Sequence, residues 1–401
     1  MTQDTGRGPT DTADVVVIGA GVVGASVAYH LARRGCRNVL VLERRDRPGL
    51  GSTGKASGGF RGQFTTDVCV RLSLLAREKL LRFRDEVGAD PGYRPVGYVF
   101  MAKTPAQLAA LRQALGVQRA AGLHQAREVD PGDIGRLSPA ARMDGIVGGT
   151  WCPIDGYIVP LQIMRGYLAA AERLGARIEY GVGEAACLVD GGPVPDARRV
   201  RGVRTERGEV ATRCVVNAAG PWAGLVARTA GVTLPVTPLR RQTALTYPFP
   251  ALPDDTPMTI NVDDKFHFRV LDGRALLLWP GDTPRADPFD TTFEPRWLDQ
   301  MLPYAHATVP CLRDARIDLD RCLCGLYEMS PDKHVILGAA PGVEGLFLVN
   351  GSSGHGVMHS PALGHLVAEM ILDGRAHTLD VHPLRPTRFD EGEPNVDTGV
   401  L

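Results

Sequence analysis

The clearest pattern of hydrophobic and polar positions lies near the start of the chain. The run DVVVI, from Asp14 to Ile18, is typical of a strand buried on both faces of a parallel sheet. From Ala25 to Arg34 apolar residues recur at helical spacing, and Gly35 ends the predicted helix. Val39 to Leu42 is a second short apolar run. This order predicts a β-α-β unit of about thirty residues.

The remaining pattern predicts a mixed chain of helices and short strands. Helices are expected over 72–87, 104–121, 161–174 and 360–372, and Thr104-Pro105 opens the second of them. Strands are expected at 96–102 and 347–350, at 266–270 and 275–279 around the turn Asp272-Gly273, and as a meander at 177–180, 200–204, 209–212 and 214–217. Residues 1–13 and 385–401 are polar, and we expect them to be flexible tails.

Composition places the chain among ordinary globular proteins. It has 401 residues, of which 44% are hydrophobic and 22% charged, and this length predicts about two to three domains. Because 45 basic residues balance 45 acidic ones, no general attraction to nucleic acid or to an anionic membrane is expected. We find no pattern of a membrane-spanning segment or a signal peptide, and the eight scattered cysteines favour reduced thiols, so we expect a cytoplasmic protein. No metal site is predicted, because the pair Cys322 and Cys324 has no second pair at zinc-finger spacing.

A glycine-rich turn joins the first strand to the first helix. Its sequence is Gly19-Ala20-Gly21-Val22-Val23-Gly24, the G-x-G-x-x-G pattern of dinucleotide-binding folds. In that pattern the first glycine makes a tight turn, the second lets the backbone approach a pyrophosphate, and the third lets helix and strand pack closely. The N–H groups of the helix start, around Val22 and Val23, would face the phosphates. Glu43, followed by Arg44, ends the second strand 43 − 24 = 19 residues after the last glycine, and we expect its carboxylate to bind an adenosine ribose hydroxyl.

Three further segments of small residues favour FAD over NAD. The first is the loop 51–59, with Gly51, Ser52, Thr53, Ser57, Gly58 and Gly59, which could alternatively be a flexible surface loop. The second follows a predicted strand and contains Ala218, Gly220 and Trp222. The third contains Gly354, His355 and Gly356 and continues into Val357 and Met358. This last turn offers a helix N-terminus to the electron-rich end of a reduced flavin.

Together these segments resemble the FAD-dependent amine and amino-acid oxidase family, nearest to its sarcosine oxidase, dimethylglycine dehydrogenase and glycine oxidase branch. The stretches GSTGKASGGFRGQF (51–64), GLYEMSPDKHVILG (325–338) and NGSSGHGVMHSPALG (350–364) carry the resemblance, which extends from Asp14 to about Gly374. It implies an α/β (α+β) fold with a Rossmann-like FAD domain from segments 14–92, 147–234 and 325–384, and a substrate domain on an antiparallel sheet from segments 93–146 and 235–324. It also implies oxidation of a C–N bond by hydride transfer to flavin N5, giving an imine that hydrolyses.

The resemblance implies roles for several residues and also shows departures. Arg61 corresponds to an arginine that binds the substrate carboxylate, and its planar fork suits that group, although a surface salt bridge is the alternative. Met358 replaces a second carboxylate-binding lysine, so either Arg61 holds the carboxylate alone or the substrate is not a small N-methyl amino acid. Strand 275–279 lacks the lysine that assists reaction with O2, so O2 and another electron acceptor both stay open. Gly325 occupies the place of a flavin-linking cysteine and Cys324 misses it by one residue, so we expect noncovalent FAD with Cys324 as the fallback attachment site.

The substrate-facing residues are less well defined by the sequence. Lys265, His267 and Arg269 alternate with two phenylalanines, which predicts a strand with one basic and one apolar face; a merely solvated basic face is the alternative. His267 falls where relatives place an active-site tyrosine, and Tyr98, Tyr157 and Tyr327 could line the pocket. His355, beside the flavin-facing turn, is a further candidate, with a structural hydrogen-bonding role as the alternative. A small-molecule amine is the expected substrate. A partner-dependent or noncatalytic subunit of the same fold, an NAD-dependent enzyme, and a homo-oligomer are left open.

Overall fold

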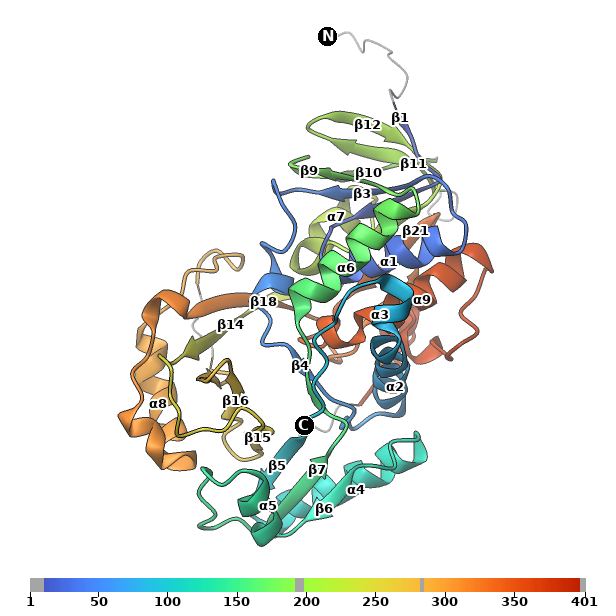
Figure 1. Ribbon diagram of the computed structural model, residues 1–401. Coiled ribbons are helices and arrows are strands. Elements are labelled where there is room, and N and C mark those ends of the chain that lie inside the picture. Colours follow the sequence, from blue (N-terminus) through green and yellow to red (C-terminus); the bar gives the residue numbers. More distant parts are fainter. Residues whose placement is uncertain (1–10, 192–197, 282–284, 397–401) are drawn as a thin grey trace.

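The computed structural model describes residues 11–191, 198–281 and 285–396. A mainly parallel six-stranded sheet forms the centre of its larger part (Figure 1). In spatial order its strands are β19 (Ile336–Ala339), β21 (Leu346–Asn350), β13 (Val215–Asn217), β2 (Val15–Ile18), β3 (Val39–Glu43) and β9 (Arg177–Tyr180). Only β19 runs antiparallel to its neighbour. The continuous apolar runs of β2 and β3 are buried along their length, as strands covered on both faces require.

Alternate residues of these strands belong to two separate cores, because successive side chains of a strand point to opposite faces. Val15 and Val17 pack with helices α1 (Val22–Arg33), α2 (Asp67–Leu81), α6 (Pro160–Arg173) and α9 (Gly356–Leu372). Val16 and Ile18 pack against α7 (Ala223–Thr229) and a second sheet made of β1 (Asp11–Thr12), β12 (Gly208–Ala211), β11 (Arg198–Thr205), β10 (Ala186–Asp190) and β20 (Val343–Glu344).

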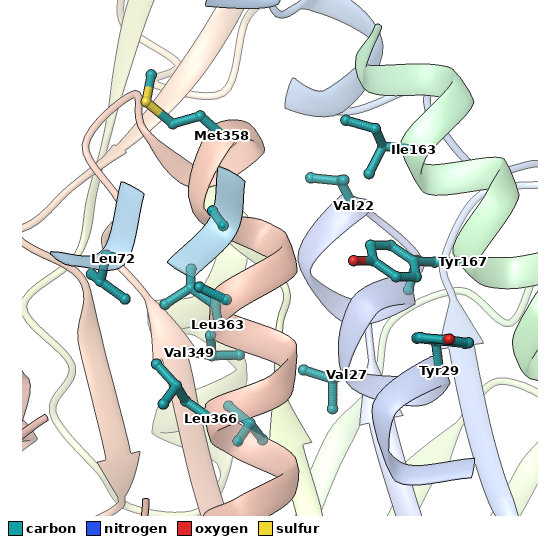
Figure 2. Packing of buried hydrophobic residues seen from close by; sticks show 14 of the residues in the cluster. Val22, Val27, Tyr29, Leu72, Ile163, Tyr167, Val349, Met358, Leu363 and Leu366 are labelled. Atoms are coloured by element: carbon teal, nitrogen blue, oxygen red, sulfur yellow. The ribbon is translucent and has the colours of Figure 1, made fainter. Parts of the chain in front are cut away.

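Helix α1 lies between α6 and α9, and its side chains contact both (Figure 2). The ring of Tyr29 of α1 packs against that of Tyr167 of α6, with centroids 5.1 Å apart and ring planes tilted by 38°. On the other side, a Cβ atom at Gly364 of α9 would lie 2.2 Å from the Ser26 hydroxyl oxygen, so only glycine allows this approach. The packing fixes the N-termini of α1 and α9, and with them two of the predicted cofactor-binding turns.

An eight-stranded sheet forms the second part of the molecule, below the first in Figure 1. Its order is β18 (Leu323–Met329), β14 (Thr237–Leu245), β17 (Arg274–Leu278), β16 (His267–Leu271), β15 (Met258–Asn261), β5 (Tyr98–Ala102), β7 (Gly148–Cys152) and β6 (Arg127–Val129). All neighbours are antiparallel except β15 and β5. Helices α4 (Pro105–Ala120), α5 (Pro131–Leu137) and α8 (Arg296–Thr308) accompany this sheet. The remaining elements are α3 (Phe83–Val87) and the short pair β4 (Gly59–Phe60) and β8 (Gly156–Tyr157).

Several sequence predictions differ from this arrangement. Strands β9 and β13 join the parallel sheet beside β3 and β2, and the meander is formed by β10, β11 and β12 instead. Helix α9 begins at Gly356, four residues earlier than predicted. One predicted domain boundary, between residues 324 and 325, falls inside β18, because this strand pairs with β14 over its whole length. All the predicted domain boundaries stay a prediction.

The described parts of the two predicted tails are ordered rather than flexible. At the N-terminal end, β1 pairs in parallel with β12, while residues 1–10 lie outside the described residues. At the C-terminal end, Arg388 is fully buried and donates from Nε and Nη2 to the Asp332 carboxylate at 2.8 and 2.9 Å. Asn395 donates to the same carboxylate. The polar composition of this segment did not predict its order, because Asp332, the partner of Arg388, is distant in sequence. Among the described residues, no helix combines the length and the apolar character needed to cross a membrane.

Candidate functional site

A cavity of about 660 Å³ extends from the N-terminus of α1 to the eight-stranded sheet. Nearly all predicted cofactor-binding residues line it: Gly19, Gly21, Val22, Val23, Glu43, Arg44, Gly51, Ser52, Thr53, Ser57, Gly58, Gly59, Ala218, Gly220, Trp222, Gly325, Gly354, His355, Gly356, Val357 and Met358. Arg61, His267 and Tyr327 line it as well. Gly24 and Arg269 are not among the lining residues, so the structure brings together all but two of the predicted set.

The three glycines of the first turn have different physical roles. Gly19 has φ +106°, and a Cβ atom there would lie 2.5 Å from the carbonyl oxygen of Ala218. A Cβ atom at Gly24 would lie 1.9 Å from the Gly19 carbonyl oxygen. These two glycines are therefore required by the fold. A Cβ atom at Gly21 would meet no protein atom closer than the Thr53 hydroxyl, at 3.4 Å, so the absence of a side chain there leaves space in the cavity itself.

The start of α1 provides an anion-binding end to the cavity. Gly21 is its N-cap residue and has no side chain to cover the first-turn N–H groups, while the first turn carries no acidic residue. The Val22 N–H donates to the Thr53 hydroxyl at 3.1 Å, which fixes the second glycine-rich loop against the helix start. A helix N-terminus with glycine at this point fits a pyrophosphate group.

The end of β3 provides a second polar wall. The two carboxylate oxygens of Glu43 accept from the backbone N–H groups of Ala20, at 3.1 Å, and Arg45, at 3.0 Å. These contacts hold the carboxylate at the cavity, where its other lone pairs can accept from ribose hydroxyls. The Arg44 guanidinium lies 5.2 Å from the Trp222 ring, and both residues line the same end.

At the opposite end, one face of the eight-stranded sheet closes the cavity. The strand register places Thr243, Leu278, His267, Ile260 and Phe100 directly opposite one another across five consecutive strands, and all five line the cavity. This row is apolar except for Thr243 and His267. It is formed by cross-strand pairing, so spacing within any single strand could not reveal it.

Arg61 reaches the cavity from the segment after β4 and is 9% exposed. Its Nη1 donates to the Gln63 carbonyl oxygen at 2.7 Å, and its Nη2 lies 3.4 Å from His355 Nε2. Its guanidinium carbon lies 4.1 Å from the centre of the Phe64 ring. Arg61 is thus a buried cation held by a carbonyl group, an imidazole and an aromatic face, and the surface-salt-bridge alternative does not describe it.

Two histidines that line the site, His267 and His355, have lowered pKa values. Burial, with a smaller contribution from the Arg61 charge, lowers the pKa of His267 to about 4, although the bond to the Lys265 carbonyl oxygen opposes this shift. Because that carbonyl accepts from Nδ1 at 2.8 Å, the Nε2 atom of His267 carries the lone pair. Burial, together with Arg61, also holds the pKa of His355 well below its usual value, which agrees with His355 Nε2 accepting from Arg61.

The predicted basic face of Lys265, His267 and Arg269 does not form as a row of three cations. His267 is neutral, and Arg269 is buried away from the cavity lining. The Arg269 Nη1 donates to the Ser57 carbonyl oxygen at 2.6 Å, and its guanidinium carbon lies 3.6 Å from the centre of the Tyr157 ring. Arg269 therefore supports the loop 51–59 instead of facing a substrate.

Three acidic residues at or near the site were missed by sequence reasoning: Glu184 and Glu328, which line the cavity, and Asp155, which does not. Glu328 lines the cavity beside Tyr327, and burial raises the pKa of its carboxyl to about 7. Its Oε1 accepts from the Ser352 N–H at 3.3 Å, and among the described residues its buried Oε2 has no hydrogen-bond partner. Asp155 is fully buried behind Arg61. Glu328 directly follows Tyr327, a candidate pocket residue, in the stretch GLYEMSPD, but nothing in the sequence indicates that Asp155 lies near Arg61.

Fold and site together define an FAD-dependent oxidoreductase: a dinucleotide-binding turn, a carboxylate at the end of the next strand and a cavity that ends on a separate sheet. The comparison with known families agrees. Residues 14–370 match the profile described as DAO, FAD dependent oxidoreductase, and the chain belongs to this family.

Individual relatives resemble the chain over nearly its whole length. The FAD-dependent oxidoreductase domain-containing protein 1 of Xenopus laevis is 27% identical over 99% of this chain and 86% of its own length. The human mitochondrial sarcosine dehydrogenase is 29% identical over 97% of this chain, which spans 43% of that longer protein. Among solved structures, the L-proline dehydrogenase of P. horikoshii superimposes with a TM-score of 0.86 at 26% identity, covering 96% of this chain and 100% of that one.

Proposed function

We propose that this oxidoreductase oxidises the C–N bond of an amine or amino acid whose carboxylate is held by Arg61. The observation that carries the proposal is the placement of Arg61, a 9% exposed cation that lines the cavity at its sheet-facing end. The names of similar proteins support the substrate class, because sarcosine dehydrogenase, dimethylglycine dehydrogenase and L-proline dehydrogenase all act on amino acids.

The residues present fit FAD, which we infer is bound noncovalently. Gly19, Gly21 and the α1 N-terminus would hold its pyrophosphate, Glu43 its ribose, and the turn 351–356 the flavin end. Cys324, the fallback attachment site, is buried and is not among the residues that line the cavity, which favours noncovalent binding. When bound, FAD supplies an acceptor for the hydride that leaves the carbon beside the amine nitrogen.

In this proposal the chain binds and orients the substrate, and His267 does not act as the base. Among the described lining residues the carboxyl groups are those of Glu43, Glu184 and Glu328. His267 has a pKa near 4, so its Nε2 cannot hold a proton taken from an ammonium group at neutral pH. We infer that the amine reacts in its neutral form, because a lone pair on nitrogen is needed to expel the hydride, and that the resulting imine hydrolyses in water.

The mainly apolar row of cavity-lining residues on the sheet would provide a hydrophobic surface against which the substrate packs. Phe100, Ile260 and Leu278 flank His267, whose Nε2 lone pair can accept one hydrogen bond from a bound amine. Arg61 and this row together favour a carboxylated amine with an apolar body.

The proposal is tested by anaerobic flavin reduction with a panel of amino acids and N-alkyl amino acids, followed by admission of O2 to distinguish an oxidase from a dehydrogenase. Arg61→Ala should weaken binding of the active carboxylated amine by about 2–5 kcal/mol, because a carboxylate would be left unpaired in a buried site. Arg61→Lys should recover part of that loss, and Arg119→Ala, at an exposed position of α4, serves as the control. Equal turnover of the carboxylated amine in wild type and Arg61→Ala, with full FAD in both, would contradict the proposal.

A further inference from the structure

Asp155 is a fully buried carboxylate in the turn between β7 and β8. Its Oδ1 accepts from the Gly62 N–H at 2.6 Å, and its Oδ2 accepts from Gln63 Nε2 at 3.0 Å. Both donors belong to the segment that directly follows Arg61. Asp155, which is 93 positions from Gly62 and 92 from Gln63, thus fixes the segment next to Arg61, the proposed carboxylate-binding residue.

The contacts continue from Gln63 to the Arg61 guanidinium. The Gln63 carbonyl oxygen accepts from Arg61 Nη1 at 2.7 Å, and Gln63 Nε2 also donates to the Tyr98 carbonyl oxygen at 3.2 Å. Gln63 is completely buried, so these groups have no water to replace a lost partner. Asp155 is therefore linked through one residue to one of the two described hydrogen bonds of the Arg61 side chain.

Keeping Asp155 at this place has an energetic cost, which points away from simple filling of space. Burial raises the pKa of Asp155 to about 6, although the hydrogen bonds from Gly62 and Gln63 and the Arg61 charge oppose that shift. At neutral pH the group is still ionised and accepts from both donors. A buried carboxylate is expensive unless it is fully hydrogen-bonded, and here both oxygens are engaged by the same short segment.

We propose that Asp155 is a positioning residue that, through Gly62 and Gln63, sets the orientation of the Arg61 guanidinium toward the substrate carboxylate. This inference rests on the proposed function of Arg61. Asp155 itself touches neither the cavity nor a substrate, since it is not among the lining residues. Its removal should impair recognition of an anionic group while leaving the cofactor end of the cavity unchanged.

Substitutions at Asp155 and Gln63 distinguish the effect of the Asp155 hydrogen bonds on Arg61 from the effect of the Asp155 charge. Asp155→Asn can still accept from the Gly62 N–H. Its amide can donate to Gln63 Oε1, which has no partner among the described residues, when the Gln63 amide turns over and gives up its bond to the Tyr98 carbonyl oxygen. Asp155→Ala removes both contacts. Gln63→Met keeps the volume and the backbone carbonyl but removes the side-chain contact to Asp155. Asp144→Ala, at an 89% exposed side chain, is the matched control.

The experiment uses the full-length, FAD-loaded protein and acetate as the probe, with acetamide as its neutral counterpart. Binding is followed by the change in flavin absorbance at constant ionic strength, and FAD content and melting temperature are measured for every variant. Asp155→Ala should raise the Kd for acetate about tenfold or more, Gln63→Met by a smaller factor, and Asp155→Asn by less than about fivefold. Acetamide binding and FAD content should stay as in wild type.

Unchanged acetate binding in Asp155→Ala would overturn the inference. So would an equal loss in Asp155→Ala and Asp155→Asn, because the charge rather than the positioning would then be responsible. If Asp155→Ala does not fold, Gln63→Met decides, and wild-type acetate affinity in that variant would refute the linkage. Arg61→Ala separates this inference from the proposed function: if it binds acetate as wild type does, or if wild type does not bind acetate, the carboxylate role of Arg61 fails first.

Discussion

Replacing Gly21 by alanine tests the assignment of the phosphate site most directly. Its φ of −68° and ψ of 177° are accessible to any residue, and the nearest protein atom to the new Cβ would be the Thr53 hydroxyl oxygen at 3.4 Å. The fold should therefore tolerate the substitution. The added methyl group would instead occupy the space in front of the first turn of α1, where a pyrophosphate must come within hydrogen-bonding distance of the backbone.

The expected effect on FAD binding follows from the contacts that would be lost. Hydrogen bonds to a charged group contribute about 1.5–3 kcal/mol each, so displacing the pyrophosphate from one or two N–H groups should weaken FAD binding by about 10- to 10⁴-fold. Gly21→Val, with a bulkier side chain, should give colourless protein. Wild type should purify yellow, with one FAD per chain released by acid or heat.

The assay combines FAD content after purification with the rise in melting temperature on adding FAD, which depends on the Kd. Gly24→Ala is the contrasting variant, because its Cβ would lie 1.9 Å from the Gly19 carbonyl oxygen and should destabilise the fold with or without FAD. A Gly21→Val protein that folds and retains full FAD would refute the assignment of this turn.

Two other substitutions test the electrostatics of the cavity. His267→Phe should lower the rate of flavin reduction by less than about tenfold, and this rate should still rise with pH, because a histidine with a pKa near 4 is not the base. A loss of rate of about 10²–10⁴-fold at saturating substrate and high pH would make His267 the base. The free energy of unfolding of Glu328→Gln, measured relative to wild type by denaturant unfolding, should be higher at pH 8 than at pH 5 by up to about 1–3 kcal/mol. The folded-state pKa of Glu328, near 7, exceeds the ordinary value of 4.5, so the wild type loses stability as pH rises between these values. An equal difference between wild type and Glu328→Gln at the two pH values would show that burial does not govern this carboxyl.

The sequence alone determined the cofactor half of the protein, because that half depends on local features. The turn at Gly19, Gly21 and Gly24 requires a strand, glycines and a helix within a short stretch, and periodicity and residue type report all three. Glu43 could be predicted as a candidate because it is the acidic residue at the end of the next strand. The confirmed family membership and fold rest on the same stretches.

Tertiary structure decided the substrate half, because its residues meet through pairing of distant strands. The neighbours of His267 are Ile260 and Leu278 on flanking strands, and its low pKa comes from burial that a single strand cannot report. Arg269 shares a strand with His267 yet turns to the Ser57 carbonyl, so alternation alone gave it the wrong surroundings.

The same reason explains the ordered C-terminal segment and the support of Arg61. Arg388 lies in a polar stretch, but its carboxylate partner, Asp332, is 56 residues away. Asp155 is still farther from Gly62, and only the folded chain brings the two within 2.6 Å. Hydrogen bonds between buried groups leave no periodic trace in a sequence, since each needs one residue at one place, whereas helices, strands and glycine turns need a repeated pattern.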